Sequence, residues 1–260
     1  MADETAEIME YSNQLEAKSG ELTTHARKLR DAHDKLTKLS VQKDAFLSQI
    51  SHELRTPMTS IRAFSEILQD PDLAEGDRPK YARIIEDETQ RLTRLLDDLL
   101  DLSVLENGQV SLELRQASLR DILDRAQASS NSGQHIKIRR SVGREDISIL
   151  TDPDRLTQVF INLMSNAVKY CEVPQPELRI IVTETPVAIT VDFIDNGDGV
   201  DKANQDMIFE KFARASDHTK AGGAGLGLAI CREIISNLGG QIFYLPGQRG
   251  AAFRISLPRD

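Results

Sequence analysis

One histidine of the chain has neighbours whose types and spacing could do chemistry. His52 lies in the segment SQISHELRTPMTSI at Ser48–Ile61, where Glu53 follows it directly and Thr56 and Pro57 come four and five positions later. A free imidazole has a pKa of about 6.5, so an exposed histidine is mostly uncharged near neutral pH and has a nucleophilic ring nitrogen. The segment therefore predicts a nucleophile at His52.

The element that must position His52 is a helix. Apolar residues recur three, four or seven positions apart around it: Phe46, Ile50, Leu54, Ile61, Phe64 and Leu68. This spacing is typical of an amphipathic helix with one buried stripe. His52 lies two positions from both Ile50 and Leu54, which turns it about 200° from the stripe and toward solvent. Pro57 would kink or loosen the next turn, which makes an inconsequential surface histidine the weaker alternative.

Composition limits the class of protein. With 260 residues and 40% hydrophobic content, the chain is long enough for about two domains with ordinary cores. A net charge of −9 and a pI near 5.2 argue against a nucleic-acid-binding surface. No apolar run approaches the roughly 18 residues of a membrane span, so we expect a soluble chain. Cys171 and Cys231 lack any metal spacing, and we expect packing residues in a reducing cytosol.

The N-terminal part predicts a coiled coil that continues into the histidine helix. Apolar residues fall seven apart through a charged, proline-free segment: Ile8, Leu15, Leu22, Leu29 and Leu36. This pattern is typical of a coiled coil about four heptads long. The second hydrophobic position of its heptads is poorly filled, and Gly20 costs about 1 kcal/mol of helix propensity. A solvated, fraying helix is the open alternative. No breaker separates the coil from His52, so a twist in one should reach the other.

A second helix and a second domain follow. Turn residues between positions 70 and 79 precede an apolar stripe that runs from Tyr81 to about Leu105. Two such helices form a hairpin with a half-covered stripe, and two hairpins would bury it as a four-helix bundle, so we expect a homodimer. The pattern breaks at Glu106. We therefore expect a coil at 1–42, a dimerising hairpin at 43–106 and another domain at 110–260.

The second domain mixes strands and helices. Strands are predicted at 110–114, 136–142, 147–151, 177–184, 188–194, 241–245 and 252–257, and helices at 119–129, 153–171 and 226–237. The order lacks a regular alternation of strand and helix. The expected fold class is therefore α + α/β, in which the helical hairpin precedes an α/β sandwich with helices on one face of its sheet.

Three polar or glycine-rich segments of this domain could hold a nucleotide. Asn162 and Asn166 lie one turn apart on an otherwise apolar helix, where they could pair with each other or converge on a cation and its phosphates. Asp195–Val200, DNGDGV, directly follows an apolar strand, but could be an ordinary turn. Gly222–Leu228, GGAGLGL, opens a helix, where free backbone N–H groups can cradle phosphate. Each segment alone leaves both interpretations open.

Together and in order, these segments resemble a known family. SHELRTP is similar, without a gap, to the phospho-acceptor box of bacterial sensor histidine kinases of the commonest dimerisation-domain type. The later segments, with Ile208–Arg214 between them, resemble the asparagine, glycine and phenylalanine boxes of an ATPase superfamily. That superfamily includes histidine kinases, gyrase, the heat-shock chaperone of ninety kilodaltons and mismatch-repair proteins. The resemblance covers about Lys43 to Pro258.

The resemblance implies roles for particular residues. His52 would attack the γ-phosphate of ATP, Glu53 would accept the imidazole's other N–H, and Thr56 would place a hydrolytic water during dephosphorylation of a partner. ATP and Mg²⁺ are the implied cofactors. Asn166 would bind Mg²⁺, assisted by Asn162. Lys169 would contact phosphate, and Tyr170 would pack beside the nucleoside. Asp195 would accept a hydrogen bond from the adenine amino group. The other implied nucleotide positions are Gly197, Gly199, Arg214, Gly223, Gly225, Leu226 and Gly227.

The function implied is that of a two-component sensor histidine kinase core. As a homodimer, it would phosphorylate His52 and pass the phosphoryl group to an aspartate of a response regulator, with phosphatase activity toward that regulator. A nucleotide-regulated phosphatase or docking scaffold is the alternative. A stand-alone ATPase is disfavoured, because Asn162 stands where hydrolysing members carry a glutamate. We expect a cytoplasmic chain without a membrane span, either a cytosolic subunit or the cytoplasmic part of a longer or membrane-bound sensor.

Overall fold

The structure is a computed structural model, and it describes residues 2–106, 111–130, 136–141, 146–213 and 225–259. The chain divides into two compact units, Met1–Glu53 and Leu54–Asp260. Within the described ranges, no helix combines the length and the hydropathy that crossing a membrane requires.

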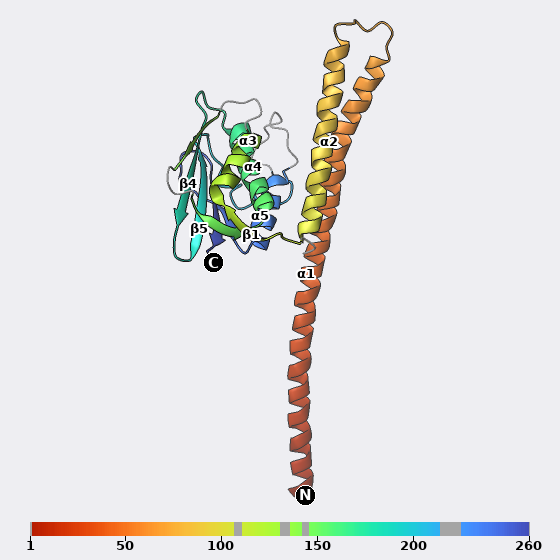
Figure 1. Ribbon diagram of the computed structural model, residues 1–260. Helices are drawn as coiled ribbons and strands as arrows, with labels where there is room; N and C mark the ends of the chain where they lie inside the picture. The colour runs from red at the N-terminus through yellow and green to blue at the C-terminus, as the bar shows by residue number, and fades with distance from the viewer. Residues whose placement is uncertain (1, 107–110, 131–135, 142–145, 214–224, 260) are drawn as a thin grey trace. The chain divides into compact units, whose positions relative to one another are not determined.

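Helix α1 (Ala2–Leu68) is a single helix that includes both the coil segment and the histidine segment (Figure 1). The expected continuity between them is therefore confirmed. Pro57 lies inside α1 and does not end it. The heptad leucines with described exposure are Leu22, Leu29 and Leu36, and 66–71% of each is accessible to solvent. A stripe that repeats every seven residues is thus uncovered in the single chain.

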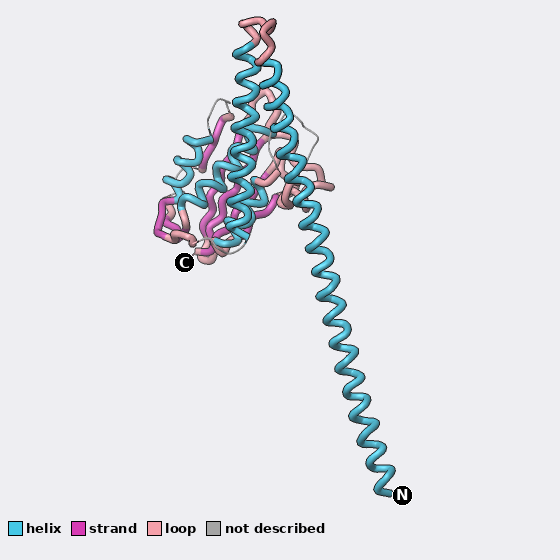
Figure 2. The backbone as a smooth tube through the Cα atoms, turned by 90° about the vertical axis from the view of Figure 1, so that its right-hand side faces the viewer, coloured by secondary structure: helices cyan, strands magenta, loops and turns pink. Residues whose placement is uncertain are grey.

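A turn joins α1 to α2 (Arg78–Glu106) and forms the expected hairpin. The guanidinium of Arg78 donates to the carbonyl oxygens of Leu68 at 3.0 Å and Asp70 at 3.1 Å, and so caps the end of α1. The rings of Phe64 and Tyr81 stack across the hairpin with centroids 5.5 Å apart. These contacts hold the part of α1 that follows Leu54 against α2, as Figure 2 also shows.

The described residues of the α/β domain form two sheets. Antiparallel β1 (Arg115–Ser118) and β3 (Ser148–Thr151) form the smaller one. The larger sheet has the order β2-β4-β5-β7-β6, in which only the pair β2–β4 is parallel. Its strands are β2 (Lys137–Arg140), β4 (Glu177–Glu184), β5 (Ala188–Asp195), β6 (Gln241–Tyr244) and β7 (Ala252–Pro258).

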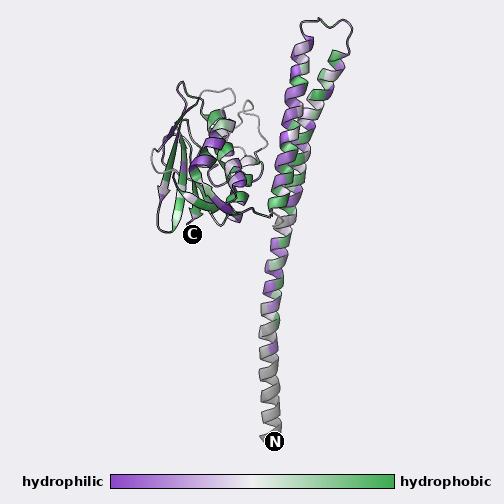
Figure 3. Cartoon of the chain, viewed as in Figure 1, coloured by the Kyte–Doolittle hydropathy of each residue, from purple (hydrophilic) through white to green (hydrophobic). Residues whose placement is uncertain are grey.

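Helices α3 (Leu119–Ser130), α4 (Pro153–Tyr170) and α5 (Gly227–Asn237) cover one face of the larger sheet (Figure 1), which confirms the expected α/β sandwich. The rings of Phe160 on α4 and Phe193 on β5 meet in this layer with centroids 5.2 Å apart. Hydrophobic residues run along the central strands in Figure 3. On β5, the buried carboxylate of Asp192 pairs with Arg254 of β7 through two contacts of 2.6 Å.

Two predicted strands need correction. No strand forms at 111–114, and β1 begins only at Arg115. The reason is visible at Glu113, whose backbone N–H donates to Oδ2 of Asp152 at 3.1 Å instead of joining a ladder. The strand predicted at 136–142 is shorter, since β2 ends at Arg140; position 142, like 110, lies outside the described residues. The other boundaries agree within one or two residues.

The aromatic contact between α4 and β5 should support the stability of the α/β domain. Replacing Phe160 with Ala removes a fully buried ring and leaves a cavity, so the free energy of unfolding should fall by about 3–5 kcal/mol in urea titrations followed by circular dichroism. Val187→Ala, at an exposed position, is the control and should change it by less than about 0.5 kcal/mol. Equal effects of both substitutions would contradict this view of the core.

Candidate functional site

The geometry of the site begins at the start of α4. Oδ1 of Asp152 accepts hydrogen bonds from the backbone N–H groups of Asp154 and Arg155 at 3.1 Å, and Pro153 occupies the first helical position. The sequence predicted this cap. One side of α4 is buried through residues such as Leu156, Leu163 and Met164, so the helix has a fixed rotation. Asn162 and Asn166 then lie half-buried, one turn apart.

The start of α5 lies directly against Asn162. A side-chain carbon added at Gly227 would come within 2.5 Å of Nδ2 and 2.6 Å of Oδ1 of Asn162, so a larger residue there would require the Asn162 side chain or α5 to move. Behind this contact, the buried thiol of Cys231 donates to the carbonyl oxygen of Val159 at 3.9 Å. Burial raises the pKa of this thiol far above its usual range. The structure thus brings Asn162 against Gly227 of the glycine segment, although the two residues lie 65 positions apart in the sequence.

A glycine with positive φ links the segment before α5 to the helix. Gly225 has a φ of 71°, and its carbonyl oxygen accepts a hydrogen bond from the N–H of Phe212 at 2.9 Å. Leu226 is buried at the N-cap position and makes no side-chain capping bond. The first N–H groups of α5 are thus not capped by that side chain, which suits an anionic ligand. Arg214 and Gly223 lie outside the described residues.

A buried carboxylate stands at the end of β5. Oδ1 of Asp195 accepts hydrogen bonds from the N–H groups of Gly197 and Ala251, both at 2.9 Å. Burial raises the pKa of Asp195 above its ordinary value, and these two bonds oppose that effect. Gly250 allows the close approach, since a side chain there would come within 2.2 Å of the Asp195 carbonyl oxygen. Gly199 has a φ of 77° and turns the chain beyond Asp195.

Asn196 holds the end of β5 to the segment that follows α4. Its Oδ1 accepts from the N–H of Glu177 at 2.8 Å and from the thiol of Cys171 at 3.1 Å. Its Nδ2 donates to the carbonyl oxygen of Gln175 at 2.9 Å. No motif in the sequence predicts this role for Asn196. The only available signal was an amide directly after Asp195, in the motif DNG.

Lys169 and Tyr170 occupy the last turn of α4, and both are exposed. Partial burial of the ammonium and repulsion by Arg94 of α2 lower the pKa of Lys169, while attraction to Asp98 opposes this shift. Burial and the neighbouring Asp101 raise the pKa of Asp98 to about 6. Asp101 in turn accepts hydrogen bonds from Arg155 at 3.2 Å and from Gln158 at 2.8 Å.

The predicted acceptor residues lie on α1. His52 is exposed, which confirms the orientation expected from the helical pattern. Glu53, beside it, is only 8% exposed, and its Oε1 accepts from Nε2 of Gln49 at 3.5 Å. Thr56 is exposed one turn later. The structure therefore presents an accessible imidazole next to a buried carboxylate.

The nucleotide residues combine features that suit a nucleoside phosphate. The fixed carboxylate of Asp195 can accept a hydrogen bond from an amino group. The amide of Asn162 lies against a helix start, which favours phosphate. Within the described ranges, no group of three or more His, Cys, Asp or Glu residues could hold a metal. An Mg²⁺ bound at this site could take oxygen ligands from the amides, from phosphates and from waters.

Comparison with known proteins gives matches in both parts of the chain. A model of the His Kinase A (phospho-acceptor) domain matches residues 42–108, and a model of histidine kinase-, DNA gyrase B- and HSP90-like ATPases matches residues 151–260. Sensor protein kinase WalK of Staphylococcus aureus is 33% identical over 239 residues, which cover 87% of this chain and 56% of WalK. The chain thus spans about half the length of this relative.

Solved structures of similar fold include two histidine kinases. Full-length ShkA in complex with AMPPNP has a TM-score of 0.57 and 26% identity, over 83% of this chain and 46% of ShkA. ThkA in complex with the response regulator protein TrrA has a TM-score of 0.63 and 22% identity, over 86% of this chain and 63% of that chain. The ThkA likeness concerns the fold alone.

The contact of Gly227 with Asn162 can be tested directly. Gly227→Ala would push the start of α5 away from Asn162, and we expect at least tenfold weaker binding of a fluorescent ADP analogue, about 1.4 kcal/mol. Gly76→Ala is the control, because a side chain there meets nothing within 4 Å, and it should leave the affinity unchanged. A folded Gly227→Ala variant with normal affinity would show that this approach does not shape the site.

Proposed function

The chain belongs to the histidine kinase family, and from this premise we propose that it is the catalytic core of a two-component sensor kinase. It would phosphorylate His52 with ATP and pass the phosphoryl group to an aspartate of a response regulator. The observation that carries the proposal is the exposed imidazole of His52 beside the buried Glu53, in a chain that also builds the Asp195 and Gly227 site.

The proposed first step is a direct phosphoryl transfer. A ring nitrogen of His52 forms a bond to the γ-phosphorus, the bond from that phosphorus to the bridging oxygen breaks, and ADP leaves with the electron pair. Glu53 accepts a hydrogen bond from the N–H on the other ring nitrogen, which fixes the tautomer and stabilises the positive ring. The burial of Glu53 supports this role, because a carboxylate shielded from water interacts more strongly with a neighbouring charge.

The proposed nucleotide contacts follow the site's geometry. The carboxylate of Asp195, which two backbone N–H groups orient, accepts a hydrogen bond from the adenine amino group. Gly225, Leu226 and Gly227 place the start of α5 at the phosphates. Gly197 and Gly199 let the backbone turn around the base, while Lys169 contacts phosphate and Tyr170 packs beside the nucleoside. The contacts implied for Arg214 and Gly223, which lie outside the described residues, belong to the same proposal.

We assign Mg²⁺ to Asn166, with assistance from Asn162. Both amides are half-buried on α4, and Asn162 lies against the helix start that would face the phosphates. When bound, the ion would neutralise charge on the phosphates. Asn162 lacks the basicity needed to activate water, so the site favours transfer to His52 over hydrolysis.

The acceptor surface would also serve the response regulator. Thr56 is exposed one turn after His52, where its hydroxyl could position a water during dephosphorylation of the regulator. ThkA, a kinase of the same fold, was solved in complex with a response regulator protein. The exposed Thr56 also supports the second candidate, a nucleotide-regulated phosphatase or scaffold with little autokinase activity. We place either reaction in the cytoplasm, where two free cysteines remain reduced.

The proposed layout is a coil at 1–42, a dimerisation and histidine phosphotransfer domain at 43–106, and an ATP-binding domain at 110–260. The family matches at 42–108 and 151–260 support this division. A homodimer would complete it. Leu96 and Leu100 of α2 are 45% and 66% exposed and lie one turn apart, and the heptad leucines of α1 are exposed as well. A second hairpin would bury these residues in a four-helix bundle.

Incubation with γ-labelled ATP and Mg²⁺ tests the proposed activity. The chain should acquire acid-labile label, because the N–P bond hydrolyses in acid, and His52→Gln should reduce the label at least a hundredfold. His33→Gln, an exposed histidine on the same helix, is the matched control and should label normally. An unlabelled chain that still binds ATP would reject autokinase activity and favour the phosphatase or scaffold.

Sedimentation equilibrium tests the homodimer. The double substitution Leu96→Ser with Leu100→Ser should weaken dimerisation at least a hundredfold, since burial of each leucine contributes about 1.5–3 kcal/mol. Val187→Ser, at an exposed site of the α/β domain, should leave the dimer unchanged. A dimer equally stable with and without the two leucines would show that α2 does not form the interface through this face.

A further inference from the structure

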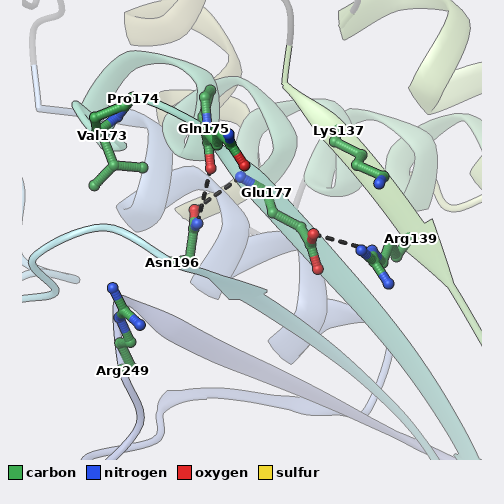
Figure 4. A pocket seen from close by; sticks show the side chains of 9 residues that line it. Lys137, Arg139, Val173, Pro174, Gln175, Glu177, Asn196 and Arg249 are labelled. Carbon is green, nitrogen blue, oxygen red and sulfur yellow. Dashed lines mark hydrogen bonds and ion pairs between the residues drawn. The ribbon is translucent and has the colours of Figure 1, made fainter.

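A pocket of about 440 Å³ opens in the α/β domain beside Asn196 and the segment between α4 and β4 (Figure 4). Lys137 and Arg139 of β2 line one side, and Arg249, from the turn between β6 and β7, lines the other. Asn196 stands between them. Its volume falls within the range of about 300–1,000 Å³ that small-molecule sites usually have. Asp195 itself does not line this pocket, and neither Asn162 nor the start of α5 does.

The pocket is cationic in an acidic chain. Its lining carries three basic side chains and one carboxylate, Glu177, while the whole chain has a net charge of −9. Nε of Arg139 already pairs with Oε2 of Glu177 at 2.9 Å. In the part of the chain that the structure describes, Lys137 and Arg249 form no ion pair with a carboxylate. Two positive charges therefore remain available to a ligand.

Another part of the lining is apolar. Val173, Pro174 and Pro176 belong to the segment between α4 and β4, and Figure 4 shows Val173 and Pro174 next to Gln175 above Asn196. Proline rings have little conformational freedom to lose, so this wall is largely preformed. A ligand that fits both parts of the lining combines two negative charges with a small apolar body.

The pocket is also connected to the nucleotide carboxylate. Asn196 lines it and bonds to Glu177, Gln175 and Cys171, so its amide ties the pocket wall to the end of β5. The next residue toward the strand is Asp195. A dianion that competes with Glu177 for Arg139, or that shifts the segment at 173–176, would move Asn196 and with it the Asp195 carboxylate.

We propose that this pocket binds a small organic dianion, with its charged group between Lys137 and Arg249 and its apolar part on Val173 and the prolines. Through Asn196, its occupancy would change the affinity for nucleotide, and nucleotide would change the affinity for the dianion by the same factor. The proposal does not depend on phosphoryl transfer. It can therefore succeed or fail separately from the kinase function.

Phenyl phosphate is a suitable probe, because it joins a phosphate dianion to an apolar ring. The full chain is first saturated with Mg·ADP, and phenyl phosphate is then titrated while backbone amide NMR signals are followed. Saturable shifts are expected for Asn196, Glu177 and Arg249. Inorganic phosphate, which lacks the ring, should bind at least tenfold more weakly, and neutral benzyl alcohol should produce no such shifts.

Charge-removing variants give the decisive comparison. Lys137→Gln and Arg249→Gln should each weaken phenyl phosphate binding at least tenfold, and their amide spectra report whether they are folded. Arg83→Gln makes the same change of charge at an exposed position of α2 and should have no effect. Absent shifts, equal losses in all three variants, or displacement of ADP by phenyl phosphate would each overturn the site.

The coupling has its own measurement. The ADP dissociation constant should change at least threefold when phenyl phosphate is saturating, and the phenyl phosphate constant should change by the same ratio when ADP is added. Binding of phenyl phosphate without any such change would retain the pocket as a site and overturn the link through Asn196.

Discussion

The nucleotide site depends on the burial of one carboxylate. A buried carboxylate is costly unless hydrogen bonds compensate, and Asp195 receives two of them on a single oxygen. One donor, Gly197, is local, but Ala251 comes from the far end of the sequence and reaches Asp195 only because β7 pairs with β5. Gly250 must then lack a side chain. The register in which β7 pairs with β5, the turn at Gly250 and the orientation of the Asp195 carboxylate therefore depend on one another.

Local signals in the sequence were sufficient for much of the fold. The turn after α1, the Asp152 cap and the apolar spacing of α4 depend on residues close in sequence, and the structure agrees with each. Contacts between distant segments could not be predicted in this way. Glu113 bonds to Asp152 and so leaves no strand at 111–114, and no periodicity indicates that a side chain 39 positions away will take up its N–H.

The candidate site shows the same division between local and distant information. Motif resemblance predicted Asp195, Asn162 and Gly227 as nucleotide-binding residues, because each can be recognised within its own short segment. That Gly227 touches Asn162 requires the packing of α5 on α4, and the bonds of Asn196 require β4 beside β5. Residues that hold others in place carry no chemical signature of their own, which is why Asn196 and Ala251 were not predicted.

The two cysteines have a practical consequence for spectroscopy. Both are buried, and desolvation raises the pKa of each thiol, so little thiolate forms near neutral pH. The native chain is therefore close to a cysteine-silent background. One cysteine placed on an exposed face of α1 and a second on an exposed face of the α/β domain would accept spin labels or fluorophores selectively. The distance between the two labels could then be followed without first replacing Cys171 or Cys231.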